Sequence, residues 1–286
     1  MSNAVYSLVM PKAQTSCAVF NSPHSGSAYP REFLSRTRLG RLQMRSSEDA
    51  FVDELFGGAP DRGAPLLAAQ TPRAWVDFNR SCDDLDPALI AGASRRFVNP
   101  RIAAGLGVIP RVVAEGRPII EGKLTLAEAR ARLDICWRPY HRVLQDLVRA
   151  QRTRFGTAIL FDCHSMPHDA LSTAPVVWGR RPEIVLGDRF GAACGRWLVD
   201  AAADMFASAG FAVARNAPFA GGYITQAYGR PRQGCHALQI EIDRSLYMDE
   251  ATIEKRPDFD DVRDRLTRVV SELVTIGPDA LPVAAE

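Results

Sequence analysis

Several motifs that would assign a function at once are absent from this chain of 286 residues. None of the six cysteines forms a C-x-x-C pair, which argues against a zinc ribbon or a dithiol redox site. The serine-hydrolase motif G-x-S-x-G and the metallopeptidase motif H-E-x-x-H are also missing. Serine hydrolysis is therefore disfavoured, and any metal ligands must be dispersed along the sequence.

Long apolar runs and basic clusters are absent as well. No apolar run approaches the ~20 residues that a membrane-spanning helix needs. The first residues lack the basic start and apolar core of a signal peptide. Only three of the 35 basic residues are lysines, and the scattered arginines leave a net charge of +2. We therefore expect a cytoplasmic protein that binds neither membranes nor nucleic acid, in which a few arginines grip carboxylates.

Apolar segments with the length of buried strands alternate with amphipathic helical segments through most of the chain. Strands are expected at residues 16–20, 66–69, 74–78, 157–160, 183–187, 211–214 and 236–243. Helices are expected from about residue 46, at 125–147 with a kink at Pro139, at 193–209 and at 259–274. This alternation predicts an α/β fold: one domain spanning residues 1–286, with a mainly parallel mixed sheet flanked by helices.

The segment Phe161–Met166 directly follows one of these apolar runs. It carries Asp162 and His164, which are two residues apart and so lie on the same face of a strand. A strand that ends in this way brings an imidazole to the sheet edge where ligands of α/β proteins bind. Asp162 is then placed to accept a hydrogen bond from the ring and to fix the tautomer of His164. The alternative is a partly buried histidine beside a polar loop.

Polar residues mark three other predicted strands. His24 follows the first strand, and Asn79 and Arg80 follow the third. Glu241 interrupts the apolar alternation of the last strand, where an unpaired carboxylate is costly. Two histidines and a carboxylate can hold Zn²⁺ and leave a position for water, whose proton Glu241 is placed to accept. A structural salt bridge from Glu241 to a nearby arginine, for example Arg244, is the alternative.

Seven short segments, in order from about residue 20 to residue 250, carry a resemblance to a known family. They are Ser22–Gly26, Glu48–Asp49, Val76–Arg80, Trp137–His141, Asp162–Ser165, Gly221–Thr225 and His236–Glu241. Together they make the sequence resemble the N-formylglutamate amidohydrolase family. That family is similar in turn to the zinc carboxypeptidases and aspartoacylases, so the resemblance implies a zinc-peptidase-like (phosphorylase/hydrolase-like) fold.

The resemblance implies a metal-dependent amidohydrolase. Its substrate would be a small acidic N-acyl amino acid, N-formyl-L-glutamate or a relative, cleaved to formate and L-glutamate in histidine degradation. Zinc or another divalent metal would be held by His24, Asp49 and His164. The residue three after His24 is Ser27, not the acid of the H-x-x-E found in the zinc carboxypeptidases. Asp49 fits the family's acid best, with Glu48 as the runner-up.

The resemblance also implies roles around the metal. Glu241 would activate the water and later protonate the leaving amine. Because glutamate has two carboxylates, Arg80 needs a second cationic partner. The residues expected to bind the substrate are Asn79, Arg80, Arg111, Tyr223 and Arg244, with Arg111 and Arg244 as candidates for that partner. Tyr223 stands where the family has histidine in Gly-Gly-x-Ile-Thr, which leaves the acyl group of the substrate open.

Other function classes compete with this interpretation. A thiol hydrolase is disfavoured, because Cys163 and His164 are adjacent on a strand and point to opposite faces. A related N-acyl amino acid deacylase, a carboxypeptidase-like hydrolase and a non-catalytic binding protein on the same scaffold stay open, since a fold does not fix a function. The sequence makes no prediction about the oligomeric state.

Overall fold

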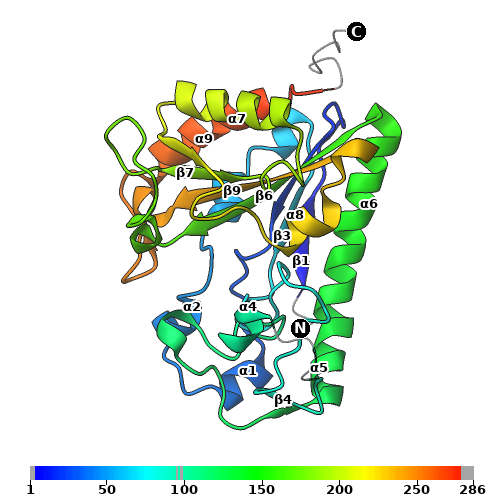
Figure 1. The fold of residues 1–286 in the computed structure, drawn as a ribbon, viewed down its shortest axis with the longest axis vertical. Helices are drawn as coiled ribbons and strands as arrows, with labels where there is room; N and C mark the ends of the chain where they lie inside the picture. The colour runs from blue at the N-terminus through cyan, green and yellow to red at the C-terminus, as the bar shows by residue number, and fades with distance from the viewer. Residues whose placement is uncertain (1–3, 95, 97–98, 278–286) are drawn as a thin grey trace.

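The computed structural model describes residues 4–94, 96 and 99–277. A sheet of seven strands in the order β1–β3–β2–β6–β9–β7–β8 forms its centre (Figure 1). The strands are β1 (Tyr6–Val9), β2 (Ala18–Ser22), β3 (Leu66–Ala69), β6 (Ala158–Met166), β7 (Ile184–Gly187), β8 (Val213–Arg215) and β9 (Cys235–Asp243). Strands β3, β2, β6 and β9 run parallel, whereas β1 and β7 pair antiparallel with β3 and β9. The predicted α/β fold with a mainly parallel mixed sheet is confirmed.

Helices flank the sheet on both faces, as predicted. They are α1 (Arg31–Arg36), α2 (Arg41–Arg45), α3 (Val52–Leu55), α4 (Pro100–Ala103), α5 (Leu126–Arg132), α6 (Arg138–Phe155), α7 (Arg196–Ser208), α8 (Tyr223–Tyr228) and α9 (Phe259–Leu273). Helices α3, α7 and α9 share an apolar core with strand residues such as Phe161 and Ile240. Helices α6 and α8 share a second apolar core with Leu160 and Ala237. Because side chains alternate along a strand, Asp162 points to the α6 face.

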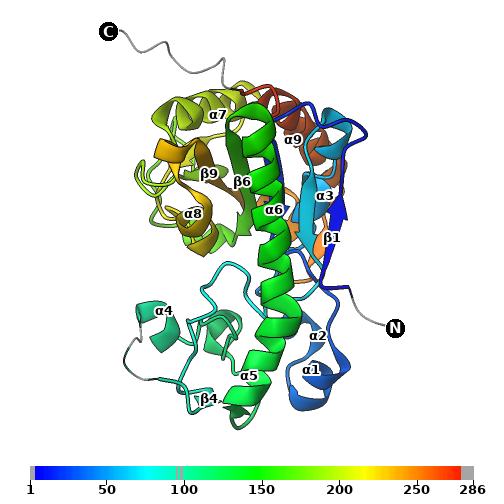
Figure 2. The same cartoon turned by 90° about the vertical axis from the view of Figure 1, so that its right-hand side faces the viewer.

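A second group of elements lies below the sheet in Figures 1 and 2. It contains α1, α2, α4, α5 and the short parallel pair β4 (Ile90–Ala91) and β5 (Leu124–Thr125). Helix α6 runs alongside both the sheet and this group (Figure 2). A further short pair, β10 (Met248–Asp249) and β11 (Glu254–Lys255), follows β9. In the part of the chain that the structure describes, no helix is long and apolar enough to cross a membrane.

Three elements differ from the expectation. Residues 74–78 form turns and irregular backbone instead of a strand, because their apolar side chains are buried in the α6-side core without a neighbouring strand to pair with. Strand β6 continues to Met166, since it pairs with β9 over its whole length, so His164 lies within the strand. The helix expected from about residue 46 is only the short α3, Val52–Leu55.

The long helix predicted from the capping box begins where expected. The Thr125 hydroxyl accepts from the Glu128 N–H, and the Glu128 carboxylate accepts from the Thr125 N–H. A π-helical turn, Leu133–Trp137, separates α5 from α6, and Pro139 lies in the first turn of α6. Proline has no N–H to continue the regular helical ladder, so the interruption predicted at Pro139 takes the form of this turn.

Candidate active site

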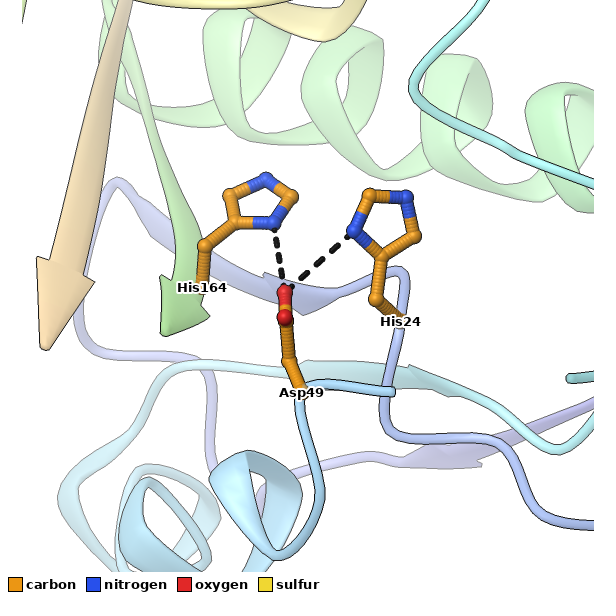
Figure 3. Close-up of side chains that lie close together, drawn as sticks. All are labelled: His24, Asp49 and His164. Atoms are coloured by element: carbon orange, nitrogen blue, oxygen red, sulfur yellow. Dashed lines mark hydrogen bonds and ion pairs between the residues drawn. The ribbon is translucent and has the colours of Figure 1, made fainter. Parts of the chain in front are cut away.

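Two histidines and an aspartate from distant parts of the chain meet at the carboxyl edge of the sheet (Figure 3). His24 follows β2, His164 lies near the end of β6, and Asp49 precedes α3. The carboxyl ends of parallel strands share one edge, which brings the histidines together. One ligand atom of each residue lies within 4.8 Å of the others, and all three side chains are buried. Within residues 4–94, 96 and 99–277, this is the group close enough to hold a metal ion.

Both imidazoles present Nδ1 to the same oxygen of Asp49. Oδ2 lies 3.3 Å from Nδ1 of His24 and 3.0 Å from Nδ1 of His164, the contacts dashed in Figure 3. Burial alone would raise the pKa of Asp49, but the hydrogen bonds from the histidines hold it well below its usual range. Nη2 of Arg244 donates to the other oxygen, Oδ1, at 3.0 Å. The two oxygens of Asp49 therefore face different partners.

A second carboxylate lies behind His24. Nε2 of His24 is 2.8 Å from Oδ1 of Asp77. The same oxygen accepts from the Asn79 N–H, and Oδ2 of Asp77 accepts from Nε of Arg73 at 3.0 Å. The Asp77 carboxylate is thus held on both sides, so it fixes the orientation of the imidazole.

A third carboxylate lies behind His164, as the sequence predicted for Asp162. Oδ2 of Asp162 is 3.0 Å from Nε2 of His164, yet it is buried and makes no well-aligned hydrogen bond to the described residues. Nδ2 of Asn79 also approaches this Nε2, at 3.2 Å. The other oxygen of Asp162 accepts from Nδ2 of Asn21, whose Oδ1 accepts from the Tyr140 hydroxyl. A chain of hydrogen bonds therefore runs from α6 to the carboxylate behind His164.

The donor set fits a divalent metal such as zinc. Two imidazole nitrogens and one carboxylate oxygen form a usual catalytic zinc site. A neutral imidazole has one N–H, yet each ring here faces a carboxylate on both sides. A cation among the three inner atoms would leave the proton of His164 on Nε2, where the charge of the Asp162 carboxylate, 3.0 Å away, stabilises it. Burial alone would lower the pKa of His164, but Asp162 and Asp49 raise it well above its usual value, as expected of a ring in a site built for positive charge.

Glu241 lies beside this group on β9. It is the register partner of His164 across the parallel β6–β9 pair, and it is only 8% exposed. Nε2 of Gln239 donates to its Oε1 at 2.8 Å, while Oε2 makes no hydrogen bond to the described residues. Burial raises the pKa of Glu241 to about 7, with Asp49 adding to the rise and His164 opposing it. A buried carboxyl group with a pKa near neutrality is suited to proton transfer.

The salt bridge considered as an alternative role for Glu241 is not formed. The guanidinium of Arg244 donates instead to Asp49, to the Ser165 hydroxyl at 3.2 Å and to the Ser46 carbonyl at 3.4 Å. Arg244 lines the cavity, as expected of a substrate-binding residue, but its three nitrogens already hold protein groups. The contact that it makes with Asp49 orients a candidate metal ligand.

Glu241 and the group of His24, Asp49 and His164 open into a cavity of about 540 Å³. The sheet edge supplies one side, and residues of the lower group, from Arg101 to Gly116, supply another. The arginines that line the cavity are Arg73, Arg80, Arg101 and Arg244. Arg73 and Arg244 pair with carboxylates, whereas Arg80 donates to the carbonyls of Leu106 and Asn79. Burial lowers the pKa of Arg80, with Asp77 opposing that effect.

The other predicted substrate residues lie in different places. Asn79 lines the cavity, but its Oδ1 accepts from the Ile224 N–H at 2.8 Å, and its Nδ2 lies 3.2 Å from Nε2 of His164. Tyr223 begins α8 and lines an adjoining cavity. Arg111 is not among the residues that line either cavity. Its Nε pairs with Asp86 at 2.8 Å, so the assignment of Arg111 to substrate binding has no geometric basis.

The structure separates the two adjacent acids, of which the resemblance favoured Asp49 over Glu48. Asp49 faces the histidines, whereas Glu48 accepts from the Tyr29 hydroxyl at 2.6 Å and from Nε of Arg45 at 2.9 Å. Burial raises the pKa of Glu48, with Tyr29 and Arg45 opposing the rise. Glu48 is therefore occupied outside the cluster.

Cys163 lies on the opposite face of β6 from the two histidines. Its side chain is fully buried in the core shared with α3, α7 and α9, and burial raises the pKa of its thiol well above the usual value. A protonated thiol without solvent access is a poor nucleophile. This geometry supports the rejection of thiol hydrolysis.

Sequence reasoning missed three residues of this site. Asp77 and Gln239 lie inside the resembling segments Val76–Arg80 and His236–Glu241, so a signal for both was present. Arg73 lies outside the segments, and only its contact with Asp77 identifies it.

Comparisons with known proteins place the chain among N-formylglutamate amidohydrolases. Residues 16–248 match the family described as N-formylglutamate amidohydrolase. The chain is 35% identical over 206 residues to the N-formylglutamate deformylases of Pseudomonas putida and Pseudomonas aeruginosa, a match that covers 71% of each chain. It is also similar to the crystal structure of N-formylglutamate amidohydrolase from Ralstonia eutropha JMP134, with 36% identity and a TM-score of 0.87. That match covers 95% of this chain and 98% of the other.

Proposed function

Because the chain belongs to the N-formylglutamate amidohydrolase family, we propose that it hydrolyses N-formyl-L-glutamate, or a closely related N-acyl amino acid, to formate and the free amino acid. Membership of this family makes the chain an amidohydrolase, the enzyme class predicted from its sequence. The observation that carries the proposal is the position of Glu241 beside the His24, Asp49 and His164 group in one arginine-lined cavity.

His24, Asp49 and His164 are the proposed ligands of zinc or another divalent metal. When bound, the metal supplies a Lewis acid that polarises the formyl carbonyl and acidifies water. The protein contributes the orientation of the ligands. The hydrogen bond to Asp77 holds Nε2 of His24 in its protonated form, and the charge of Asp162 favours the proton on Nε2 of His164. Each Nδ1 is then left with a lone pair directed inward.

Glu241 is the proposed general base. It takes a proton from the attacking water and later delivers it to the nitrogen of the leaving amino acid. Since Gln239 occupies Oε1, Oε2 is the oxygen available to accept the proton. The raised pKa supports both steps, because a group that titrates near neutral pH can accept a proton and give it back.

Arg80 is the proposed anchor of the α-carboxylate. Its guanidinium lines the cavity, and no carboxylate of the described residues forms an ion pair with it. Its remaining donors suit a planar carboxylate, which guanidinium groups bind through two parallel hydrogen bonds.

A hydrolysis screen tests the function. The purified protein, supplied with zinc, would be given N-formyl and N-acetyl derivatives of glutamate, glutamine and leucine. It would also be given a dipeptide with a free C-terminal carboxylate, as a substrate for carboxypeptidase activity. We expect formate release from N-formyl-L-glutamate with the highest kcat/KM, abolished by a chelator and restored by zinc. Preference for an acetyl group would assign a related deacylase, and dipeptide cleavage a carboxypeptidase-like enzyme. Absence of all hydrolysis from a folded, metal-loaded chain would favour the non-catalytic binding protein.

A further inference from the structure

A second cavity, of about 400 Å³, adjoins the proposed active-site cavity. The residues that line both are Asn79, Arg80, Arg101, Gly221 and Gly222. The proposed metal ligands and Glu241 line only the first cavity, whereas Arg189 and Tyr223 line only the second. The proposed catalytic residues and the second cavity are therefore connected through these shared lining residues.

The glycine pair at this junction is required by the close packing around it. A side chain at Gly222 would collide with the amide of Asn79, and a Cβ at Gly221 would lie 2.9 Å from Cγ of Arg189. Gly221 also has a φ of 130°, which residues with side chains rarely adopt. Bare backbone thus forms part of the wall between the cavities, and the long side chains of Arg80 and Arg101 form another part.

The second cavity has a surplus of positive charge. Arg80, Arg101 and Arg189 line it, and none of the three pairs with a carboxylate of the described residues. The acid that lines it, Asp84, accepts from the Ser81 N–H and from the side-chain amide of Asn99. Guanidinium groups without a protein carboxylate, gathered in one cavity, favour an anionic ligand.

We propose that this second cavity is the subsite for the side-chain carboxylate of an acidic substrate, with Arg101 and Arg189 as its ligands. The inference rests on the proposed function. It identifies the residues that make the enzyme select an acidic substrate. The scissile amide must lie near Glu241, and the carbon that bears the amide nitrogen also bears the α-carboxylate. With that carboxylate on Arg80 at the junction, the substrate side chain extends into the second cavity.

Helix α4 supports this role for Arg101. Asn99 caps the helix by accepting from the Ile102 N–H at 2.9 Å, and the same Asn99 donates to Asp84. The helix thereby carries Arg101 to the border of both cavities. Arg101 thus replaces Arg111 and Arg244 as the second cation that a dicarboxylic substrate requires.

Binding of glutarate and of its monoamide, glutaramate, tests the subsite without turnover. Glutarate keeps the carboxylate spacing of glutamate and has no amide to cleave, whereas glutaramate carries one charge less. Calorimetry on the metal-loaded full chain should give a Kd for glutarate about tenfold below that for glutaramate. In R101Q and R189Q the ratio should approach one, chiefly through weaker glutarate binding. The matched control is R196Q, which removes a charge from a side chain that is 91% exposed on α7.

The outcomes separate the subsite from the reaction. Equal affinity of the wild type for the two ligands, or an unchanged ratio in the double variant R101Q/R189Q, would overturn the subsite. If the control R196Q also lost the preference for glutarate over glutaramate, the preference would come from the overall charge of the protein. That result would also overturn the subsite. If the wild type prefers glutarate in a manner that depends on Arg101 but hydrolyses no N-acyl amino acid, the subsite stands and the proposed reaction fails.

Discussion

His164 and Glu241 are register partners on the neighbouring parallel strands β6 and β9. Opposed residues of paired strands lie on the same face of the sheet. A candidate metal ligand and the proposed general base are therefore held side by side by a main-chain ladder that pairs nine residues of each strand. Sites built on strands keep their geometry better than sites on loops, so single substitutions here should report on chemistry more than on folding.

Removal of either histidine should empty the metal site. We expect H24A and H164A each to bind less than about a tenth of an equivalent of zinc, because two remaining ligands cannot compete with water and buffer. Elemental analysis after dialysis against metal-free buffer gives the content. H168A is the matched control, since the side chain of His168 is 42% exposed and contacts Asp243. Stoichiometric metal in both site variants would mean that the ligands are other residues.

Substitution of Glu241 by glutamine should remove the base while keeping the shape. We expect E241Q to fold, to bind metal, and to lose about two to four orders of magnitude in kcat. Melting temperature, metal content and kcat should be measured on one preparation. A stable, metal-loaded variant with full activity would contradict the role of Glu241, and a destabilised variant with normal turnover would make it structural.

The pH dependence of kcat/KM should carry the signature of the same carboxyl group. The base is active only when deprotonated, and burial raises its pKa to about 7. Activity should therefore rise as the pH increases toward 7. A bound divalent cation favours the carboxylate, so the midpoint should lie at or below that value. The residual activity of E241Q should lack this acidic limb; a limb of the same shape in the variant would assign it to another group.

The carboxylates behind the histidines should tune the affinity for metal. D77N and D162N keep the size of each side chain but weaken its grip on an imidazole N–H. We expect the zinc Kd to rise by about 10- to 100-fold in each variant, as measured by competition with a chelating dye. E48Q is a control that changes a buried carboxylate outside the cluster. Equal zinc affinity in D77N, D162N and the wild type would show that these carboxylates only fill space.

The burial of His141 should make the stability of the folded protein depend on pH. His141 is buried on α6, where Nε2 donates to the Phe78 carbonyl and Nδ1 accepts from the Tyr228 hydroxyl, both at 2.9 Å. Burial lowers the pKa of His141 to about 4, against a usual 6.5. The unfolded chain therefore binds the extra proton between pH 6.5 and 4. Stability should fall by about 3 kcal/mol as the pH drops through that window.

Urea denaturation at several pH values measures this effect. H141Q should be less stable than the wild type at pH 7, yet its stability should decline less between pH 6.5 and 4. The same slope in H141Q and the wild type would place the proton uptake elsewhere.

The residues that could be predicted from the sequence are those attached to regular strands. His24, His164 and Glu241 stand at or near the ends of apolar runs, and the parallel sheet brings such ends together. Their meeting point follows from the apolar strand pattern together with the parallel arrangement of the strands. Asp49 was harder to distinguish from Glu48, because two adjacent acids before a short helix look alike in the sequence. Only the folded chain gives them different neighbours.

The cationic side chains of the cavity could not be predicted in this way. Residues 81–124 have little periodicity, and their path depends on contacts with distant segments. Arg111 was a candidate from the sequence and Arg101 was not singled out, but Arg111 pairs with Asp86, whereas Arg101 lines both cavities. The incorrect prediction of a strand at 74–78 has a similar reason. The apolar residues there are buried as expected, but they lie in a loop that places Asp77 behind His24.

The hydrogen-bond chain from Tyr140 through Asn21 to Asp162 also bears on the order in which the site is assembled. Asn21 and Asp162 lie on paired strands, but Tyr140 arrives with α6. Before that helix docks, the Asp162 carboxylate can draw the Nδ2 end of the Asn21 amide toward itself, but the Tyr140 hydroxyl that holds the Oδ1 end is missing. The histidine that Asp162 supports becomes a fully oriented ligand only afterwards. A refolding chain should consequently acquire its metal late, after α6 has closed over the sheet.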